Sequence, residues 1–222
     1  MECVDGLKHF CKLQAYNRHE RLEGKNMFQK MLMVFCIWMA MDIPILTGQA
    51  ADIASRLAKI QLTDSLGNLQ SLQSYAGKIV VYVFWSFKCP ISLVYASRLD
   101  QLLSKCQNRD VVILGIESGA NETPSAIKAN LENLKIRIPM LLDSDGILAQ
   151  ALGATHTPSV FIFDRDWVLR YRGALDNSRK VGDKGRIAYA DDALDAILAG
   201  RSVLIPETKA FGCSIRLPGN RE

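Results

Sequence analysis

The stretch VVYVFWSFKCPIS, residues 80–92, decides the fold. Its first half is a continuous apolar run rich in valine and aromatic residues, which is typical of a buried central strand. The apolar spacing of residues 91–103 predicts a helix, and Pro90 suits its first position because no amide donor is needed there and φ already fits. Cys89 is therefore predicted to lie where a strand becomes a helix, at the helix N-terminus.

This place makes Cys89 a candidate nucleophile. The positive end of the helix dipole and the neighbouring Lys88 both favour a thiolate. The alternative is an ordinary buried cysteine, because free cysteine is among the most buried residue types. Lys88 and Pro90, one on each side of the thiol, favour the reactive interpretation.

The N-terminal residues are interpreted as a targeting segment. Lys25 and Lys30 precede an apolar run, residues 31–41, that is too short to span a bilayer. Small residues follow as far as Ala51, so we expect a signal peptide cleaved near Ala50 and an exported, periplasmic mature protein. The alternative is an uncleaved membrane anchor, which is the only case in which we expect membrane contact.

The chain is thus predicted to have three parts: a leader (1–50), a domain (51–205) and a C-terminal tail (206–222). Met27 or Met31 would be a natural start, so residues 1–26 are interpreted as an upstream extension. Of the six cysteines, those that remain after the leader are Cys89, Cys106 and Cys213. An odd number in an exported protein indicates a reactive thiol or an intermolecular bridge rather than structural stapling.

Composition excludes one class of partner. The 222 residues carry a formal net charge of only +4, and the basic residues that gather late in the chain alternate with aspartates. We interpret this cluster as a solvated face and expect no nucleic-acid partner, no metal ion and no cofactor. Its basic members are Arg165, Arg170, Arg172, Arg179, Lys180, Lys184 and Arg186.

The order of expected elements indicates an α/β sandwich. Strands are predicted at 60–63 (an edge strand), 79–85, 111–116, 138–142, 160–163 and 168–171, the last two as a hairpin. Helices are predicted at 90–106, from 124 past 134, at 145–152 and at 188–199, with a polar loop at 174–185. Strands joined by helices must pair in parallel, and the hairpin adds antiparallel strands to the same sheet.

Two separated motifs carry a family resemblance. Residues 84–90 resemble the active-site segment of thioredoxin-like thiol–disulfide oxidoreductases, and residues 153–164 resemble their cis-proline segment. Together with Cys89-Pro90-x-Ser92 and the tail segment 207–215, the chain resembles an exported redoxin or peroxiredoxin-like (AhpC/TSA-type) subgroup. The resemblance implies a thioredoxin-like three-layer α/β/α sandwich, with a central mixed sheet of parallel and antiparallel strands.

The same resemblance implies the surroundings of the nucleophile. Pro158 would be cis and would face Cys89, and Thr157 would offer its backbone groups to an extended substrate; the alternative is a trans proline at an edge strand. His156 is expected near the thiol as a charge or proton carrier, the alternative being a surface histidine. Trp85, Pro90 and Ser92 complete the expected substrate-binding set, although an aromatic at Trp85 also suits core packing.

A lone thiol can attack a disulfide, but release of the mixed disulfide needs a second thiol. Ser92 cannot supply one. Cys106 lies ~25 Å along the same helix, and a disulfide needs Cα atoms within about 7 Å, so Cys106 is excluded. Two routes remain: Cys213 on a tail expected to be mobile, or an external thiol reductant. Glu117, at the end of a strand, is either a buried proton acceptor or a solvated carboxylate.

Three functions compete at this stage: a thiol–disulfide oxidoreductase acting on disulfides of proteins or small molecules, a thiol peroxidase, and a non-catalytic binding module. Peroxiredoxins carry Pro-x-x-x-Thr/Ser-x-x-Cys, and no placement on this chain satisfies it. With Ser92 at the cysteine position, Trp85 replaces the proline; with Cys89 there, Tyr82 does. We therefore expect disulfide chemistry ahead of peroxide reduction.

Overall fold

The computed structural model describes residues 45–107, 109–118, 122–180 and 182–217. Residues 1–44, and with them most of the expected leader, lie outside the described residues. The chain divides between Gln49 and Ala50 into two units, and the fold described here is that of the second unit. Among the described residues, no helix has the length and apolar character needed to cross a membrane.

The central sheet of the described chain has seven strands in the order β2-β1-β5-β4-β3-β7-β8. These are β1 (Gln61–Asp64), β2 (Leu69–Ser71), β3 (Ile79–Trp85), β4 (Val111–Glu117), β5 (Met140–Leu142), β7 (Ser159–Phe163) and β8 (Leu169–Gly173). β3 pairs in parallel with β4 and antiparallel with β7, which confirms the predicted mixed sheet. A separate ladder joins β6 (His156–Thr157) to β9 (Cys213–Ser214).

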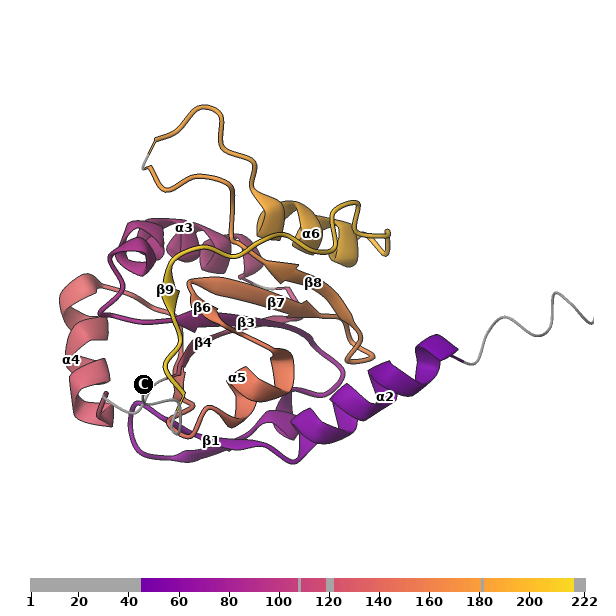
Figure 1. Cartoon of the computed structure of the whole chain (residues 1–222), viewed down its shortest axis with the longest axis horizontal. Helices are drawn as coiled ribbons and strands as arrows, with labels where there is room; N and C mark the ends of the chain where they lie inside the picture. Colours follow the sequence, from indigo (N-terminus) through magenta and orange to yellow (C-terminus); the bar gives the residue numbers. More distant parts are fainter. Residues whose placement is uncertain (1–44, 108, 119–121, 181, 218–222) are drawn as a thin grey trace, which may run out of the picture. The chain divides into compact units, whose positions relative to one another are not determined.

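Helices cover both faces of the sheet (Figure 1). They are α2 (Ile45–Ala58), the 3-10 helix η1 (Leu72–Tyr75), α3 (Pro90–Cys106), α4 (Pro124–Leu134), α5 (Ile147–Leu152) and α6 (Tyr189–Leu198). Residues of α3, α4 and α6 share one core cluster, while η1, α5 and the end of α2 share the other. The predicted three-layer sandwich is therefore confirmed.

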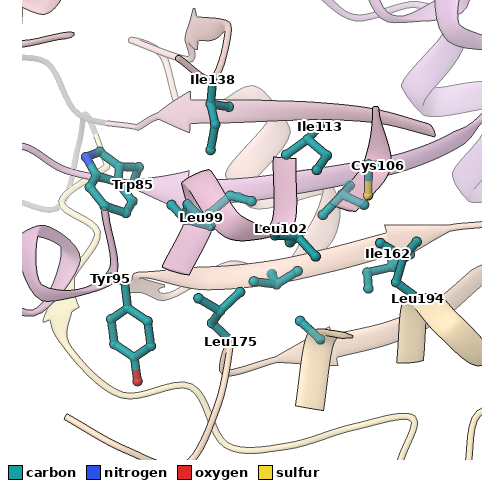
Figure 2. Packing of buried hydrophobic residues seen from close by; sticks show 14 of the residues in the cluster. Trp85, Tyr95, Leu99, Leu102, Cys106, Ile113, Ile138, Ile162, Leu175 and Leu194 are labelled. Carbon is teal, nitrogen blue, oxygen red and sulfur yellow. The ribbon is translucent and has the colours of Figure 1, made fainter. Parts of the chain in front are cut away.

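Strand β3 is buried on both faces of the sheet. Successive strand side chains point to opposite faces, and every residue of β3 is buried. Val81 and Val83 pack into the cluster with α3, whereas Val80 and Tyr82 pack into the cluster with α5. Figure 2 shows the first cluster around α3. Each such aliphatic side chain contributes about 1.5–3 kcal/mol on burial.

The prediction of an edge strand at residues 60–63 is wrong. β1 is not an edge strand, because β2 pairs antiparallel to it on the outer side and β5 on the inner side. The turn between β1 and β2 is held by Asp64, whose carboxylate accepts hydrogen bonds from the backbone N–H groups of Leu66 and Asn68. A strand as short as Leu69–Ser71 has too little alternation to be recognised from sequence.

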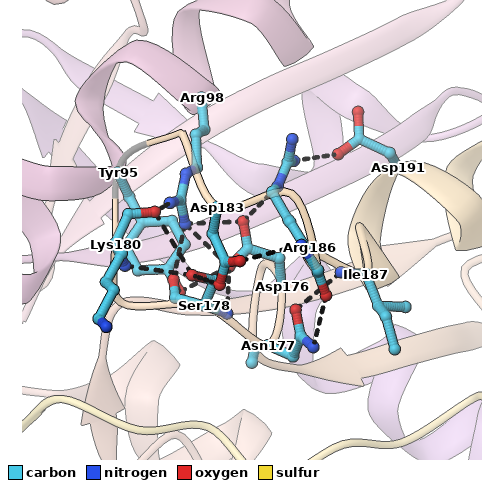
Figure 3. Close-up of polar contacts among 12 residues, drawn as sticks. Tyr95, Arg98, Asp176, Asn177, Ser178, Lys180, Asp183, Arg186, Ile187 and Asp191 are labelled. Atoms are coloured by element: carbon cyan, nitrogen blue, oxygen red, sulfur yellow. Dashed lines mark hydrogen bonds and ion pairs between the residues drawn. The ribbon is translucent and has the colours of Figure 1, made fainter.

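The prediction that the charged residues late in the chain form a solvated face is wrong for Asp176. The Asp176 side chain is fully buried, and both of its oxygens bind Arg98 of α3 at 2.8–2.9 Å (Figure 3). Arg186 donates to the same carboxylate at 2.6 Å and Tyr95 at 2.8 Å. Alternating charges indicated solvation, but they form an internal network that holds the loop between β8 and α6 against α3.

Candidate active site

Cys89 occupies the place predicted for it. It is the N-cap of α3, Pro90 follows at the first helical position, and the Cys89 carbonyl accepts the hydrogen bond of Leu93 N–H at 3.2 Å. The chain leaves buried β3, turns through residues 86–88, and enters the helix. The Cys89 thiol is free and its residue is only 1% exposed.

The cis-proline segment lies directly against this thiol. The Thr157–Pro158 peptide bond is cis, as the family resemblance implied. The Cys89 thiol donates to the Thr157 carbonyl oxygen at 3.2 Å, across 68 positions of sequence. The two motifs singled out in the sequence therefore form one site.

The C-terminal tail also reaches the site. It was expected to be mobile, but β9 pairs antiparallel with β6 so that Cys213 stands opposite Thr157 and Ser214 opposite His156. Thr157 Oγ1 adds a bond to the Cys213 carbonyl at 3.4 Å. This pairing brings the Cys213 side chain into contact with the Cys89 thiol.

The two thiols have unequal acidity. Burial raises the pKa of Cys89, but interactions with the Cys213 side chain and with the backbone and hydroxyl of Ser92 outweigh it, so the net shift is downward. The same contact with Cys89, together with burial, raises the pKa of Cys213 to about 11. The pKa of Cys89 is thus shifted below the ordinary thiol value and that of Cys213 above it.

Lys88 forms an ion pair with Glu122 at 2.9 Å, and its side chain is 66% exposed. Its positive charge offsets part of the rise in the pKa of Glu117. The groups that lower the pKa of Cys89 include the Cys213 side chain and the backbone and hydroxyl of Ser92. That Lys88 also favours the Cys89 thiolate stays a prediction.

Glu117 is the buried acid, not the solvated carboxylate. It ends β4 directly beside Trp85 of β3, and it is 4% exposed with one carboxyl oxygen lacking a hydrogen-bond partner. Burial and the nearby Glu122 raise the pKa of Glu117 to about 8, and the Phe87 N–H offsets part of this. The strand-to-helix turn that precedes Cys89 therefore packs on a carboxyl group that titrates near neutral pH.

The other predicted site residues divide into two groups. Trp85 and Ser92 are at most 2% exposed, like Cys89 itself, and their role in substrate binding stays a prediction. Trp85 packs edge-on against Phe87, and the Ser92 hydroxyl is buried close to Cys89 with no hydrogen bond of ordinary geometry. Pro90 is exposed at the helix start. His156 lies on β6, where its Nδ1 shares a hydrogen bond with Thr155 Oγ1 at 2.9 Å.

Comparison with known proteins places the chain in a family. Residues 49–172 match the AhpC/TSA family. The chain belongs to the AhpC/TSA family. Its fold is accordingly the thioredoxin-like sandwich predicted from the sequence. The tail with Cys213 lies beyond the residues that match the family.

A curated relative and two solved structures illustrate the similarity. The thiol-disulfide oxidoreductase ResA of Bacillus thuringiensis is 24% identical over 115 residues, which cover 52% of this chain and 65% of ResA, just under two thirds of its length. A hypothetical protein of Sinorhizobium meliloti is 26% identical with a TM-score of 0.66, covering 72% of this chain and 92% of that one. An uncharacterized conserved protein of Geobacillus kaustophilus is 29% identical with a TM-score of 0.66, covering 73% and 90%.

Sequence reasoning missed the residues that dock the tail of this AhpC/TSA-family chain. Phe211 packs at 6.3 Å from the Tyr95 ring and lies under the Arg179 guanidinium at 4.7 Å. Gly212 has φ +147, and a Cβ there would collide with the Thr157 carbonyl oxygen. An aromatic and a glycine immediately before a cysteine, in an otherwise polar tail, were the available signal.

A shallow pocket lies beside the tail. Its volume is about 380 Å³, and its wall includes His156, Ser159, Arg172 and tail residues 207–210. The Ser159 hydroxyl in this wall is buried without a hydrogen-bond partner. No cluster of three or more metal-ligating side chains occurs within the residues that the structure describes.

Proposed function

We propose that this protein is a thiol–disulfide oxidoreductase in which Cys89 attacks the substrate and Cys213 resolves the mixed disulfide. The observation that carries the proposal is the pairing of β9 with β6, which sets Cys213 opposite Thr157 and against the Cys89 thiol. The usual local pair of cysteines is replaced by two thiols far apart in the sequence. Similarity to ResA, whose name describes this activity, supports the proposal.

The first step uses the lowered pKa of Cys89. Its thiolate attacks one sulfur of the substrate disulfide, so that a Cys89–substrate bond forms while the substrate bond breaks. The second substrate sulfur leaves as a thiolate and takes a proton from water. Lowering the pKa raises the thiolate fraction of Cys89 at neutral pH, which is what this step requires.

The second step depends on Cys213. Its pKa is raised chiefly by the neighbouring Cys89 sulfur, and that interaction weakens when Cys89 becomes part of a neutral mixed disulfide. Cys213 then loses its proton to water and attacks the Cys89 sulfur. A Cys89–Cys213 bond forms, the remaining substrate sulfur leaves as a thiol, and two electrons have passed to the substrate. An external thiol reductant must restore the dithiol.

Peroxide reduction is the second candidate, because the AhpC/TSA match favours it. The Cys89 thiolate would take one oxygen from a hydroperoxide, giving a sulfenate and releasing an alcohol. Cys213 would condense with the protonated sulfenic acid to give the same disulfide and water. The two reactions therefore share both cysteines and differ only in the oxidant.

Three serine variants test the proposal. Cys89→Ser should abolish turnover of a protein disulfide such as insulin, with dithiothreitol as reductant. Cys213→Ser should slow turnover at least tenfold and accumulate a mixed disulfide on Cys89, detected by mass spectrometry. Cys106→Ser is the matched control, because Cys106 lies buried at the far end of α3, and it should retain wild-type rates.

The same experiments separate the alternatives. Hydroperoxide consumption that exceeds disulfide reduction in the wild type, and that is lost in Cys89→Ser, would replace the proposal with the peroxidase. Full activity of Cys89→Ser with both oxidants would overturn both. Binding of disulfide-bearing proteins with no turnover of either oxidant would leave the non-catalytic binding module.

We also propose export, with a leader cleaved near Ala50. The short apolar run 31–41, preceded by lysines and followed by small residues, supports it. Mass spectrometry of the protein purified from its native source should give a mature N-terminus at or near Ala51. A soluble native protein that retains residues 27–49 would contradict export by a cleaved signal.

A further inference from the structure

The nucleophile in this structure is inaccessible. Attack on a disulfide requires that a substrate sulfur touch the Cys89 sulfur, yet Cys89 is 1% exposed. Its thiol is covered by the Thr157 carbonyl on one side and contacts Cys213 on another. Neither group belongs to α3, and Cys213 lies in the tail, outside the family-matched residues.

The tail is bound along its length, and we call residues 206–215 the strap. It first follows β8, where Arg172 N–H donates to the Pro206 carbonyl and Thr208 N–H donates back to the Arg172 carbonyl, both at 3.0 Å. The Thr208 hydroxyl accepts the Ala174 N–H at 3.0 Å and shares a hydrogen bond with Tyr171 at 2.7 Å. Figure 1 shows the strap in yellow, running past β7 and β8 to β6.

Phe211 and Gly212 fasten the strap next to the thiol. The Phe211 ring lies near both Tyr95 of α3 and the Arg179 guanidinium of the loop after β8. Gly212 then lets the backbone pass so close to the Thr157 carbonyl that no larger residue fits. Beyond Cys213, Ile215 N–H donates to the Thr155 carbonyl at 2.9 Å.

The strap takes the position that an extended substrate needs. The family resemblance implies that an extended substrate pairs with the backbone of Thr157, and the backbone of β6 is already paired there with β9. The Cys213 side chain and, to a smaller extent, the Cys213 backbone lower the pKa of Cys89; when the strap leaves, the contributions of the Ser92 backbone and hydroxyl remain. An incoming strand in the same place would also supply a backbone N–H, because every strand residue except proline carries one.

We propose that the strap occludes Cys89 in the resting protein, and that an extended segment of a disulfide-bearing protein reaches the thiol by replacing the strap along β6. The proposal rests on the proposed function, since it concerns the same two thiols. Strand addition to an exposed sheet edge is a general mode of peptide recognition. Return of the strap would bring Cys213 back to Cys89, so that resolution of the mixed disulfide and release of the substrate become one event.

Two variants open the strap and one leaves it closed. Phe211→Ala removes the aromatic contact, and Gly212→Ala introduces the collision with Thr157. Leu204→Ala is the control, because Leu204 is 97% exposed and precedes the strap. Circular dichroism and thermal unfolding should confirm that all three fold.

The first measurement is the rate at which iodoacetamide alkylates Cys89, followed by peptide mass spectrometry at about pH 9.5, where ionisation of an ordinary thiol no longer limits the rate. Both strap variants should react at least tenfold faster than the wild type, and Leu204→Ala within twofold of it. Equal alkylation rates in the wild type and both strap variants would overturn the proposal that the strap covers Cys89, while Cys89 would remain the proposed nucleophile. No reaction at Cys89 in either folded strap variant would instead overturn the proposed function.

The second measurement tests replacement itself. A cysteine peptide is trapped on Cys89 as a mixed disulfide in Cys213→Ser, and amide hydrogen exchange of residues 206–215 is compared with that of the untrapped variant. Exchange in the strap should accelerate at least tenfold on trapping, with Ile215 N–H as the reporter. Unchanged protection of the strap with the peptide in place would overturn the proposal.

Discussion

The two ends of α3 carry buried cysteines with opposite tendencies. Cys89 at the start is 1% exposed and Cys106 at the end is 5% exposed, so burial alone predicts the same behaviour for both. Burial raises the pKa of Cys106 and the neighbouring Arg109 and Lys105 offset only part of it, whereas hydrogen-bond donors overcome burial at Cys89. The donors around Cys89, and not a difference in burial, separate the directions of the two pKa shifts.

The ion pairs of α3 show the same contrast. Arg98, at the middle of the helix, is 7% exposed and bound to a fully buried Asp176. Lys105, in the last turn, meets Asp195 at 2.6 Å, but both side chains are about a third or more exposed. The middle of α3 is therefore anchored by desolvated charges, and its last turn by solvated ones.

Breaking the buried pair of Arg98 and Asp176 should cause the largest loss in the free energy of unfolding. Asp176→Asn removes the charge while keeping the size of the side chain, and it leaves the buried Arg98 and the half-buried Arg186 without their shared carboxylate. Loss of one partner of a buried pair costs about 3–5 kcal/mol. Urea unfolding of the purified variant measures this, and a loss below about 1 kcal/mol would show that the network is not desolvated.

The second test concerns Glu117 beneath the active-site turn. Its pKa is raised by burial from the ordinary value to about 8, so the folded state favours the protonated acid. The contribution of protonated Glu117 to the free energy of unfolding is complete below about pH 4.5. It is lost as pH rises to about 8, because the carboxyl group loses its proton in the unfolded state at lower pH than in the folded state. Wild-type stability should fall by on the order of 2–4 kcal/mol across this range relative to Glu117→Gln.

Denaturant unfolding at several pH values, with the two proteins side by side, gives the difference directly. Subtracting the unfolding free energy of one protein from that of the other cancels the contributions of all titrating groups that the two proteins share. Parallel pH profiles would mean that Glu117 is solvated in the folded protein, against its 4% exposure.

The third test compares the two thiols of α3 without requiring access to them. The ¹³Cβ shifts of Cys89 and Cys106 can be followed by NMR while pH is raised. Cys89 should titrate below the ordinary thiol value and Cys106 above it, because donors favour the first thiolate and burial disfavours the second. At pH 7 the thiolate fraction of Cys89 should therefore exceed that of Cys106. The reverse order of titration would contradict the assignment of the nucleophile.

The sequence predicted the features that depend on local pattern. The buried strand, the helix that starts at Pro90 and the hairpin near residues 160–171 follow from apolar runs, proline positions and turn residues. The approach of Thr157 to Cys89 followed from the family resemblance, since nothing local links positions 68 residues apart.

The missed features depend on tertiary partners. Charge alternation around Asp176 is typical of a solvated face, and only the approach of α3 turns it into a buried network. The tail has no strand-like period, because two paired residues are too few to produce one. Its docking comes from Phe211 and Gly212, whose partners Tyr95 and Thr157 lie more than 50 positions away.

The smallest effect is expected at the other end of α3. Asp195→Asn is the counterpart of Asp176→Asn, with the same change of atoms at a solvated pair. Water already screens both charges there, and holding two long side chains together costs entropy, so the loss should be below about 1 kcal/mol. Lys105 also keeps a second carboxylate, Asp191, at 3.9 Å. Urea unfolding at low salt and in about 1 M salt checks this, because screening should erase the remaining difference. A loss of unfolding free energy comparable to that of Asp176→Asn would show that the ion pairs at the middle and in the last turn of α3 stabilise the fold equally.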